Sequence, residues 1–385
     1  MSGTRHYLDH ASTSPLRPEA AAAIESWCGS GVYADPGRQY GEGRIARDAI
    51  EDARAAVAGL LGVRPREVIL TSGGTEAANT ASSLARPAGA SAGALCSPAE
   101  HSAVRLAARR AGRVVDLEVD GFARLDLDHL AAVLEASSDA GPPALVHCQW
   151  ANHEVGTVQP VAEVVELAHR YGIPVHVDAC VALGHVPIDL GEVPADLVSL
   201  SAHKIGGPPG VGALVVRRPA RVTPLLVGGD QERGRRAGME NVPGVLAFGA
   251  IARTLAAPCA VEIAAARERE LADALLQAAL AVGGVAAYGD TEVRAPHIVC
   301  VGVEGVEAEA VVLGLDQAGI AVHSGSACSS EAFEPSPVLE AMGVDARRSL
   351  RISVGWSSTE ADVAAFARRF PEVVERLREL AASSA

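Results

Sequence analysis

Several features that would assign this 385-residue chain to a protein class are missing, and aromatic residues make up only 3% of it. No block rich in lysine and arginine occurs and the net charge is −14, which argues against direct binding to nucleic acid or to an anionic membrane. No stretch of about 20 uncharged apolar residues occurs, so we expect no transmembrane helix. The first residues, 1–12, lack the apolar core of a signal peptide, and we therefore expect a cytoplasmic protein.

The cysteines point to the same compartment. There are seven of them, they lie far apart, and no two form a C-x-x-C pair. This pattern indicates neither a disulfide scaffold nor a zinc site, and it favours free thiols. Six of the seven lie in apolar strand or helix patterns, where we expect buried and inert side chains: Cys28, Cys96, Cys148, Cys180, Cys259 and Cys300.

What the chain does contain is alternating secondary structure. It is 49% hydrophobic with 39 glycines, and short apolar runs alternate with amphipathic patterns. Such alternation predicts an α/β protein, with a large domain built on a mostly parallel central sheet and a smaller α+β domain. We expect residues 15–250 to form the large domain and residues 1–14 with 251–385 to form the small one.

The stretch 174–216 holds the first chemical signal. A buried-looking strand ends at Asp178, and the next apolar run ends in His203 and Lys204 before a turn rich in glycine and proline. Because open α/β sheets keep their chemistry at the strand ends, Asp178 and Lys204 can lie close together. A fixed lysine and carboxylate suit pyridoxal 5'-phosphate, which is held as a Schiff base on a lysine while an acid pairs with its ring nitrogen. The alternative is a solvated lysine and an aspartate in a turn.

A second signal is a glycine-rich turn between a strand and a helix. The apolar run 68–71 is followed by Gly73, Gly74 and Thr75 and then by a helical pattern. Backbone N–H groups at a helix N-terminus bind anions, so this arrangement predicts a phosphate site, although a plain capped helix has the same local pattern. The run Gly-Glu-Gly-Arg-Ile-Ala at 41–46 nominally matches a dinucleotide fingerprint, but no apolar strand precedes it and we reject that interpretation.

The third signal lies in the C-terminal part. Cys328 is surrounded by serine, glycine and alanine with no apolar run to bury it, as expected of a reactive thiol on a loop. Arg351 begins the strand-like run Arg-Ile-Ser-Val-Gly. Its planar guanidinium can hold a carboxylate through two hydrogen bonds, which a lysine cannot reproduce.

These segments together resemble the class V aminotransferase superfamily and, within it, the cysteine desulfurases of the IscS/NifS type. The resemblance runs from the segment 7–15 to the segment 350–355 and includes S-x-H-K-I-x-G-P-x-G-x-G around Lys204 and S-G-S-A-C-S-S around Cys328. It implies the pyridoxal phosphate-dependent fold type I, a homodimer with shared sites, and conversion of L-cysteine to L-alanine. Sulfur would pass to Cys328 as a persulfide and then to an acceptor protein.

The resemblance also implies roles for single residues. It gives Cys328, Lys204 and His101 catalytic roles and assigns Arg351 to the substrate carboxylate. It places no metal in the site. It puts the cofactor in contact with a larger set: Lys204, Asp178, Gly74, Thr75, His101, Asn152, His153, Ser201 and His203.

The chain departs from the family pattern at three positions. His153 stands where the family commonly has a second asparagine, and Val181 stands where it commonly has a glutamine. In the family, that asparagine and that glutamine contact the phenolic oxygen of the cofactor. Met239 replaces a threonine that contacts the phosphate bound in the partner subunit, whereas Arg236 is retained. Two other functions stay open: another fold-type I enzyme, such as a transaminase or selenocysteine lyase, and a non-catalytic sulfur-relay scaffold.

Overall fold

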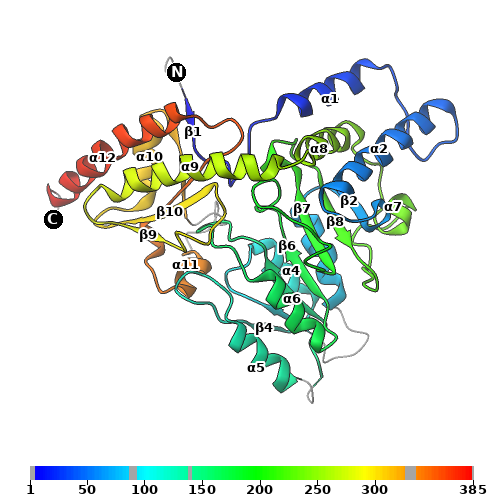
Figure 1. Ribbon diagram of the computed structural model, residues 1–385, viewed down its shortest axis with the longest axis horizontal. Helices are drawn as coiled ribbons and strands as arrows, with labels where there is room; N and C mark the ends of the chain where they lie inside the picture. Colours follow the sequence, from blue (N-terminus) through cyan, green and yellow to red (C-terminus); the bar gives the residue numbers. More distant parts are fainter. Residues whose placement is uncertain (1–4, 86–92, 138–140, 326–334, 384–385) are drawn as a thin grey trace.

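A computed structural model describes residues 5–85, 93–137, 141–325 and 335–383 of the chain (Figure 1). Within these residues a seven-stranded sheet and a separate four-stranded sheet are each covered by helices. The α/β fold with a mostly parallel central sheet is thereby confirmed. Residues 326–334, and with them Cys328, lie outside the described part of the chain.

The seven-stranded sheet carries the chemistry-bearing residues of the first half of the chain. Its strands are, in spatial order, β2 (Val68–Thr71), β8 (Gly212–Val216), β7 (Leu197–Ser201), β6 (Val175–Asp178), β5 (Leu145–Gln149), β3 (Ala94–Cys96) and β4 (Val114–Asp116). Strands β4, β3, β5, β6 and β7 are mutually parallel, while β8 runs antiparallel to both of its neighbours. The carboxyl ends of β5, β6 and β7 therefore meet at one edge of the sheet.

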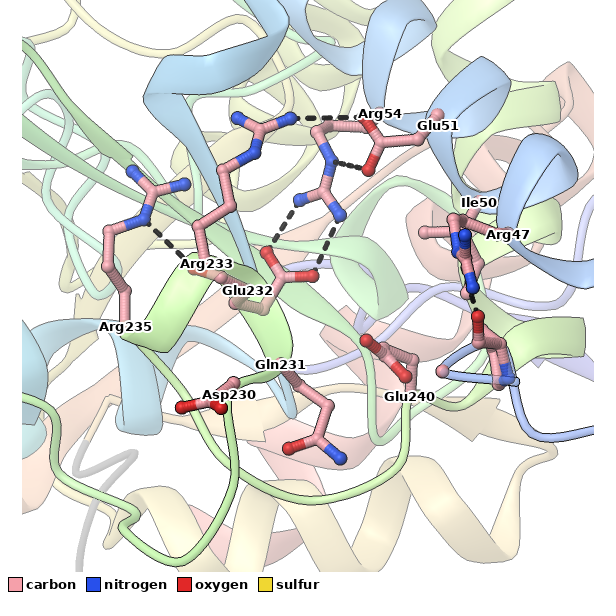
Figure 2. Close-up of a pocket in the computed structure, with 12 residues that line it drawn as sticks. Arg47, Ile50, Glu51, Arg54, Asp230, Gln231, Glu232, Arg233, Arg235 and Glu240 are labelled. Atoms are coloured by element: carbon pink, nitrogen blue, oxygen red, sulfur yellow. Dashed lines mark hydrogen bonds and ion pairs between the residues drawn. The ribbon is translucent and has the colours of Figure 1, made fainter. Parts of the chain in front are cut away.

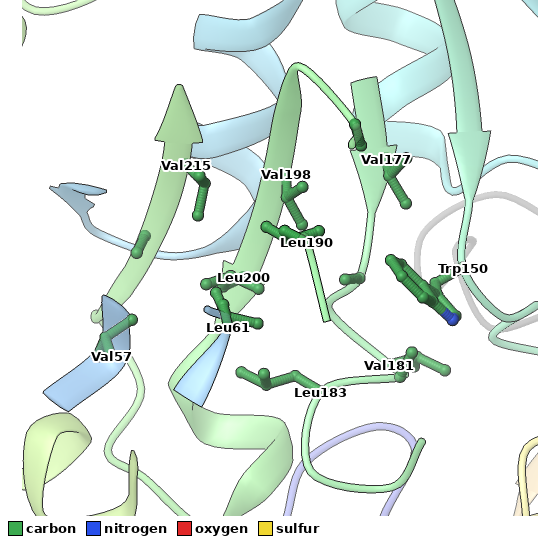
Figure 3. Packing of buried hydrophobic residues seen from close by; sticks show 14 of the residues in the cluster. Val57, Leu61, Trp150, Val177, Val181, Leu183, Leu190, Val198, Leu200 and Val215 are labelled. Carbon is green, nitrogen blue, oxygen red and sulfur yellow. The ribbon is translucent and has the colours of Figure 1, made fainter. Parts of the chain in front are cut away.

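Helices cover this sheet on both faces, which explains why its central strands read as continuous apolar runs. The helices between Pro18 and Leu255 are α1 (Pro18–Gly29), α2 (Gly41–Leu60), α3 (Gly74–Ala81), α4 (Ser102–Ala111), α5 (Leu127–Ser137), α6 (Val161–Arg170), α7 (Gln231–Gly234) and α8 (Val242–Leu255). Figure 3 shows how β6, β7 and β8 contribute Val177, Val198 and Val215 to one core with Val57 and Leu61 from the α2 region.

The four-stranded sheet is antiparallel and has its own core. Its strands are, in order, β12 (His323–Ser324), β13 (Ser349–Ser353), β10 (Ile298–Val303) and β9 (Val285–Tyr288). The accompanying helices are α9 (Ala260–Leu280), α10 (Ala308–Gln317), α11 (Pro337–Ala341) and α12 (Glu360–Ser383). The chain start returns to this region, because β1 (His6–Tyr7) pairs with β11 (Ile320–Ala321). Leu8 lies in the same core as Phe366 and Phe370 of α12.

Two local predictions can be checked against these elements. The run Gly-Glu-Gly-Arg-Ile-Ala at 41–46 forms the first turns of α2 and follows a loop, so it lacks the strand that a dinucleotide site requires. The Ala-rich region is two helices, because the chain breaks between α8 and α9 at Cys259, whose φ is 56°. Among the described residues no single helix is long and apolar enough to cross a membrane, although α8 and α9, bent by 85°, meet the length and composition test as a pair.

Candidate active site

One cavity of about 320 Å³ lies at the carboxyl edge of the parallel strands and collects most of the predicted site residues. Asn152 is not among the residues that line it, and Cys328 falls outside the described residues. The predicted residues that do line the cavity are Gly74, Thr75, His101, His153, Asp178, Ser201, His203, Lys204 and Arg351.

Asp178 and Lys204 reach the cavity from adjacent strands. Asp178 is the last residue of β6 and pairs in register with Gln149 of β5 and Ser199 of β7. Its Oδ1 accepts a hydrogen bond from the backbone N–H of Cys180 at 2.9 Å, which fixes the carboxylate at the strand end. Lys204 follows β7 in a short 3₁₀ turn, and its Nζ donates to the carbonyl of Ala11 at 2.8 Å. The sequence prediction that strand ends bring the acid and the lysine to one site agrees with this geometry.

The glycine-rich turn has the features of an anion cradle. Gly73 precedes α3 with a φ of 147°, and the helix begins at Gly74. A Cβ at Gly74 would lie 2.4 Å from Sγ of Cys180, so only glycine fits there without a shift. The Oγ of Ser201 is buried and has no hydrogen-bond partner among the described residues. A helix N-terminus beside an unused hydroxyl leaves donors available for a bound phosphate.

The histidines of the cavity are held neutral. Burial, the neighbouring His153 and the Lys204 ammonium together lower the pKa of His101 to about 3. Burial, with Lys204 and Arg351 close by, holds the pKa of His153 well below its usual range. The Nδ1 of His101 accepts the N–H of Ala103 at 3.1 Å, which leaves the proton of the neutral ring on Nε2. The two rings meet edge to face with centroids 4.9 Å apart.

Arg351 is almost completely buried at 1% exposure and is held by several partners. Its Nη2 donates to Oδ1 of Asp9 at 2.9 Å and to Oγ of Ser12 at 2.6 Å, while Nη1 donates to the carbonyl of His153 at 2.8 Å. Since each terminal guanidinium nitrogen carries two N–H groups, Nη1 retains a second donor beyond the bond to His153. A carboxylate that enters the cavity meets a guanidinium whose position is already fixed.

Two buried carboxyl groups adjoin the cavity. Burial and the nearby Asp178 raise the pKa of Glu100 to about 8. Burial also raises the pKa of Glu154 to about 7, against the opposing effect of the Ser336 hydroxyl that donates to it. Burial therefore favours the protonated form of both carboxyl groups at pH values where an exposed glutamate is ionised.

Asn152 does not line the cavity, and its amide holds the backbone: Nδ2 donates to the carbonyl of Ala99, and Oδ1 accepts the N–H groups of Glu154 and Val155. Its contact with the cofactor stays a prediction. Two other predictions need correction. Cys28 and Cys259 are exposed, contrary to the expectation of burial. Both lie at helix ends, where an apolar pattern says little about which side of the chain faces solvent.

Sequence reasoning also missed residues that line the cavity. Cys180, Gln149 and Ser12 all belong to it. Cys180 is two residues past Asp178 and Gln149 ends β5, so the rule that placed Asp178 at the strand end could have identified both. Ser12 is distant in sequence and carried no such signal.

The three departures from the family pattern occupy different environments. His153 and Val181 both line the cavity, so they change its lining directly. Met239 is 63% exposed and lies on the surface segment between α7 and α8. Arg236 is paired with the buried Glu76 at 3.0 Å, which orients it toward the start of α3.

A second cavity of about 340 Å³ lies between α2 and the segment around α7 (Figure 2). Most of the residues that line it are charged, and several of them pair with one another. The guanidinium of Arg54 donates to both carboxylate oxygens of Glu232, at 2.6 and 2.8 Å, and Glu232 also accepts the N–H of Leu70 at 2.9 Å. These contacts identify the pair as a buried cross-link between α2, β2 and the segment of α7.

The chain is similar to known proteins over almost its whole length. The family model described as "Aminotransferase class-V" matches residues 6–366. A cysteine desulfurase of Cereibacter sphaeroides is 40% identical, covering 98% of this chain and 97% of that protein, and an IscS-like cysteine desulfurase of Mycobacterium tuberculosis is 38% identical, covering 98% of each. The structure of a NifS-like protein from Rickettsia africae is 28% identical with a TM-score of 0.86, covering 97% of this chain and all of that one. The chain therefore belongs to the class-V aminotransferase family and, within it, to the cysteine desulfurases.

Proposed function

We propose that this chain converts L-cysteine to L-alanine with bound pyridoxal 5'-phosphate and carries the sulfur away as a persulfide on Cys328. The observation that carries the proposal is the convergence of Lys204 and Asp178 in one cavity with a buried arginine, Arg351. Lysine and acid suit the cofactor, and arginine suits the carboxylate of an amino acid.

The residues present fit the cofactor. Its phosphate is matched by the start of α3 and by the unused Oγ of Ser201, and a Cβ at Gly74 would narrow that end of the cavity. Its ring nitrogen is matched by the carboxylate of Asp178, and its carbonyl carbon by Nζ of Lys204. When bound, pyridoxal phosphate supplies an electron sink for the electron pair released at the substrate Cα.

Arg351 binds and orients the substrate. Its guanidinium is immobilised by Asp9, Ser12 and the carbonyl of His153, so little side-chain entropy is lost when a carboxylate binds. The carboxylate of Asp9 competes for the same cation, and the incoming carboxylate either shares Arg351 with it or displaces it. This competition favours an anionic ligand that has a second point of attachment in the cavity.

Lys204 is the base for the Cα proton, because its Nζ lies in the cavity at the position fixed by Ala11. His101 is a neutral ring with its proton on Nε2, so it can donate one hydrogen bond in the cavity without adding charge. Asp178 supplies the negative charge opposite these groups.

Cys328 takes the sulfur. Its thiolate attacks the substrate sulfur, an S–S bond forms, and the Cβ–S bond of the substrate breaks. The electron pair of that bond stays on carbon and is protonated, which yields alanine and leaves Cys328 as the persulfide. A thiolate of an acceptor protein then attacks the outer sulfur and regenerates Cys328. Each turnover therefore moves one sulfur atom at the oxidation level of a persulfide.

We also propose that the protein works as a homodimer. Tyr33, Val227 and Met239 are large apolar side chains exposed to 84%, 82% and 63%. Tyr33 lies just before Pro36 and Gly37, and Val227 and Met239 belong to the segment 227–240. Both segments line the charged cavity between α2 and α7, so they are neighbours in space. Exposed apolar side chains on neighbouring segments favour a surface that another chain covers. Sedimentation at micromolar protein concentration tests the dimer by its mass.

The two separate cores support the proposed domains. One core is built mainly on the seven-stranded sheet, although it also includes Val261, Ala295 and Ile298, and the other combines Leu8 with side chains from residue 271 onward. We propose that residues 15–250 fold as the large domain and that residues 1–14 with 251–385 fold as the small one. Limited proteolysis with mass spectrometry of the fragments tests this division.

The reaction is tested by measuring alanine and sulfide together from L-cysteine and a thiol reductant. Cys328→Ser and Lys204→Ala are compared with Cys259→Ser, a matched control because Cys259 is an exposed thiol that does not line the described cavity. We expect equal alanine and sulfide from the wild type and the control, and neither product from the two variants. Cys328→Ser should keep the cofactor absorbance that Lys204→Ala loses.

Two outcomes would change the proposal. Alanine formation that survives Cys328→Ser would contradict the persulfide step and indicate a lyase or a transaminase. A wild type that binds no pyridoxal phosphate and forms neither product would favour the sulfur-relay scaffold, and activity would then be sought with a partner protein.

A further inference from the structure

A buried cluster of metal-ligating side chains lies outside the residues that line the active-site cavity. His185 follows β6, Glu268 lies on α9, and His297 directly precedes β10; their exposures are 5%, 4% and 1%. One ring nitrogen from each histidine and one carboxylate oxygen lie within 4.8 Å of one another. The cluster therefore joins three segments that are far apart in the sequence.

An ion pair explains only part of this arrangement. Nδ1 of His185 and Oε2 of Glu268 are 2.7 Å apart, which is a hydrogen-bonded pair. The contact of His297 with that pair is ring stacking: its ring lies on the ring of His185, with centroids 3.7 Å apart and planes at 17°. The Nδ1 of His297 is buried and has no hydrogen-bond partner among the described residues. A buried polar atom without a partner lowers the stability of a fold. The ion pair between His185 and Glu268 therefore does not account for His297, whereas a ligand bound to its Nδ1 would.

We propose that His185, Glu268 and His297 bind one divalent transition-metal ion, with zinc the best match. Two imidazoles and one carboxylate are a donor set that zinc uses with a water in its fourth position. Imidazole favours Zn²⁺, Co²⁺ and Ni²⁺ over Mg²⁺ and Ca²⁺, which prefer oxygen ligands. This site goes beyond the proposed sulfur transfer, and no step of that reaction passes through it.

Binding requires a small movement and the loss of a proton. Zinc bonds of about 2.0–2.2 Å place tetrahedral donors about 3.4 Å apart, so the most distant donors must close by at most about 1.4 Å, while Nδ1 of His185 and Oε2 of Glu268, now 2.7 Å apart, must separate slightly. Rotation of the stacked His297 ring and of the Glu268 side chain supplies this movement. The cation takes the place of the hydrogen between Nδ1 of His185 and Oε2 of Glu268.

Charged groups near the cluster both favour and oppose the binding of a cation. Glu268 contributes the negative charge of the cluster, whereas Lys204 and Arg294 are positively charged groups that act on His297. The same positive neighbours oppose a cation, which makes the carboxylate of Glu268 indispensable.

The test uses the full-length holoenzyme in a Cys328→Ser background, which removes the reactive thiol as a competing ligand. The protein is freed of metal and titrated with ZnCl₂, and binding is followed by calorimetry and by bound zinc per chain. His297→Ala and Glu268→Gln are compared with His169→Ala, a matched control because His169 forms a 2.8 Å pair with Asp196 outside the cluster.

We expect one zinc per chain, a higher melting temperature with zinc, and visible d–d bands when Co²⁺ replaces it. Each cluster variant should weaken binding by more than about 100-fold, since the loss of an outer-shell partner alone costs 10–100-fold. The control should bind as the parent does. Absence of stoichiometric zinc in the parent, or equal binding by parent and Glu268→Gln, would overturn the proposal, and Glu268→Gln decides the matter if His297→Ala does not fold.

Discussion

Glu154 should make the stability of this protein depend on pH. Its side chain is 2% exposed, accepts the Ser336 hydroxyl, and lies 3.5 Å from Nε2 of His153. Burial raises its pKa from the ordinary 4.5 to about 7, so folding disfavours the charged form. Below pH 4.5 the Glu154 carboxyl is protonated in both the folded and the unfolded chain, so this group does not lower the stability. As the pH rises from 4.5 through 7, the folded state loses stability, up to about 3 kcal/mol for this difference in pKa.

Glu154→Gln replaces the carboxyl group with a neutral group of nearly the same shape that still accepts the Ser336 hydroxyl. We expect the variant to be more stable than the wild type by about 3 kcal/mol at pH 8 and by little at pH 4.5. Equilibrium urea unfolding at both pH values measures the difference. Glu166→Gln is the control, because the Glu166 side chain is 69% exposed and should change stability little at either pH. A variant less stable than the wild type at pH 8, or a difference that does not change with pH, would refute the reasoning.

Three further results are expected. Glu232→Ala removes the buried carboxylate that pairs with Arg54 and leaves that guanidinium, among the described residues, only the 44% exposed Glu51 as an acidic partner, so it should lower the free energy of unfolding by about 3–5 kcal/mol in urea titrations. Gly74→Ala should weaken pyridoxal phosphate binding in a spectrophotometric titration of the apoprotein, and adding Cys180→Ala should restore part of it, because the new Cβ meets Sγ of that residue. Ser201→Ala should weaken cofactor binding without lowering the stability of the apoprotein, since its hydroxyl has no hydrogen-bond partner in the fold.

The local pattern of the sequence was enough to predict strands of the seven-stranded sheet and the site residues at their ends, Asp178 and Lys204. Apolar runs of four or five residues identified β2, β6 and β7, and each is fully or almost fully buried. Parallel strands place their carboxyl ends at one edge, so Asp178 and Lys204 could be paired before any coordinates were known. The glycines before α3 were likewise identified by a requirement that is local to the backbone.

Contacts between distant segments could not be obtained in this way. Arg351 is held by Asp9, 342 positions away, and Glu154 accepts from Ser336, 182 positions away. Asn152 lies beside site residues in sequence, yet its amide is turned into backbone hydrogen bonds away from the cavity. No periodicity or spacing encodes which of several nearby polar side chains will face a cavity.

The sequence alone thus determined the fold class, the family, and the chemical types placed at the strand ends, because each depends on residues close together along the chain. The tertiary structure decided what surrounds those groups. Burial beside Lys204 and Arg351 makes the cavity histidines neutral, and burial brings the pKa of Glu154 to about 7. The packing of three separate segments also brings His185, Glu268 and His297 together. Desolvation and the proximity of charges arise only when the chain is packed, and they are properties of position in space, not of residue type.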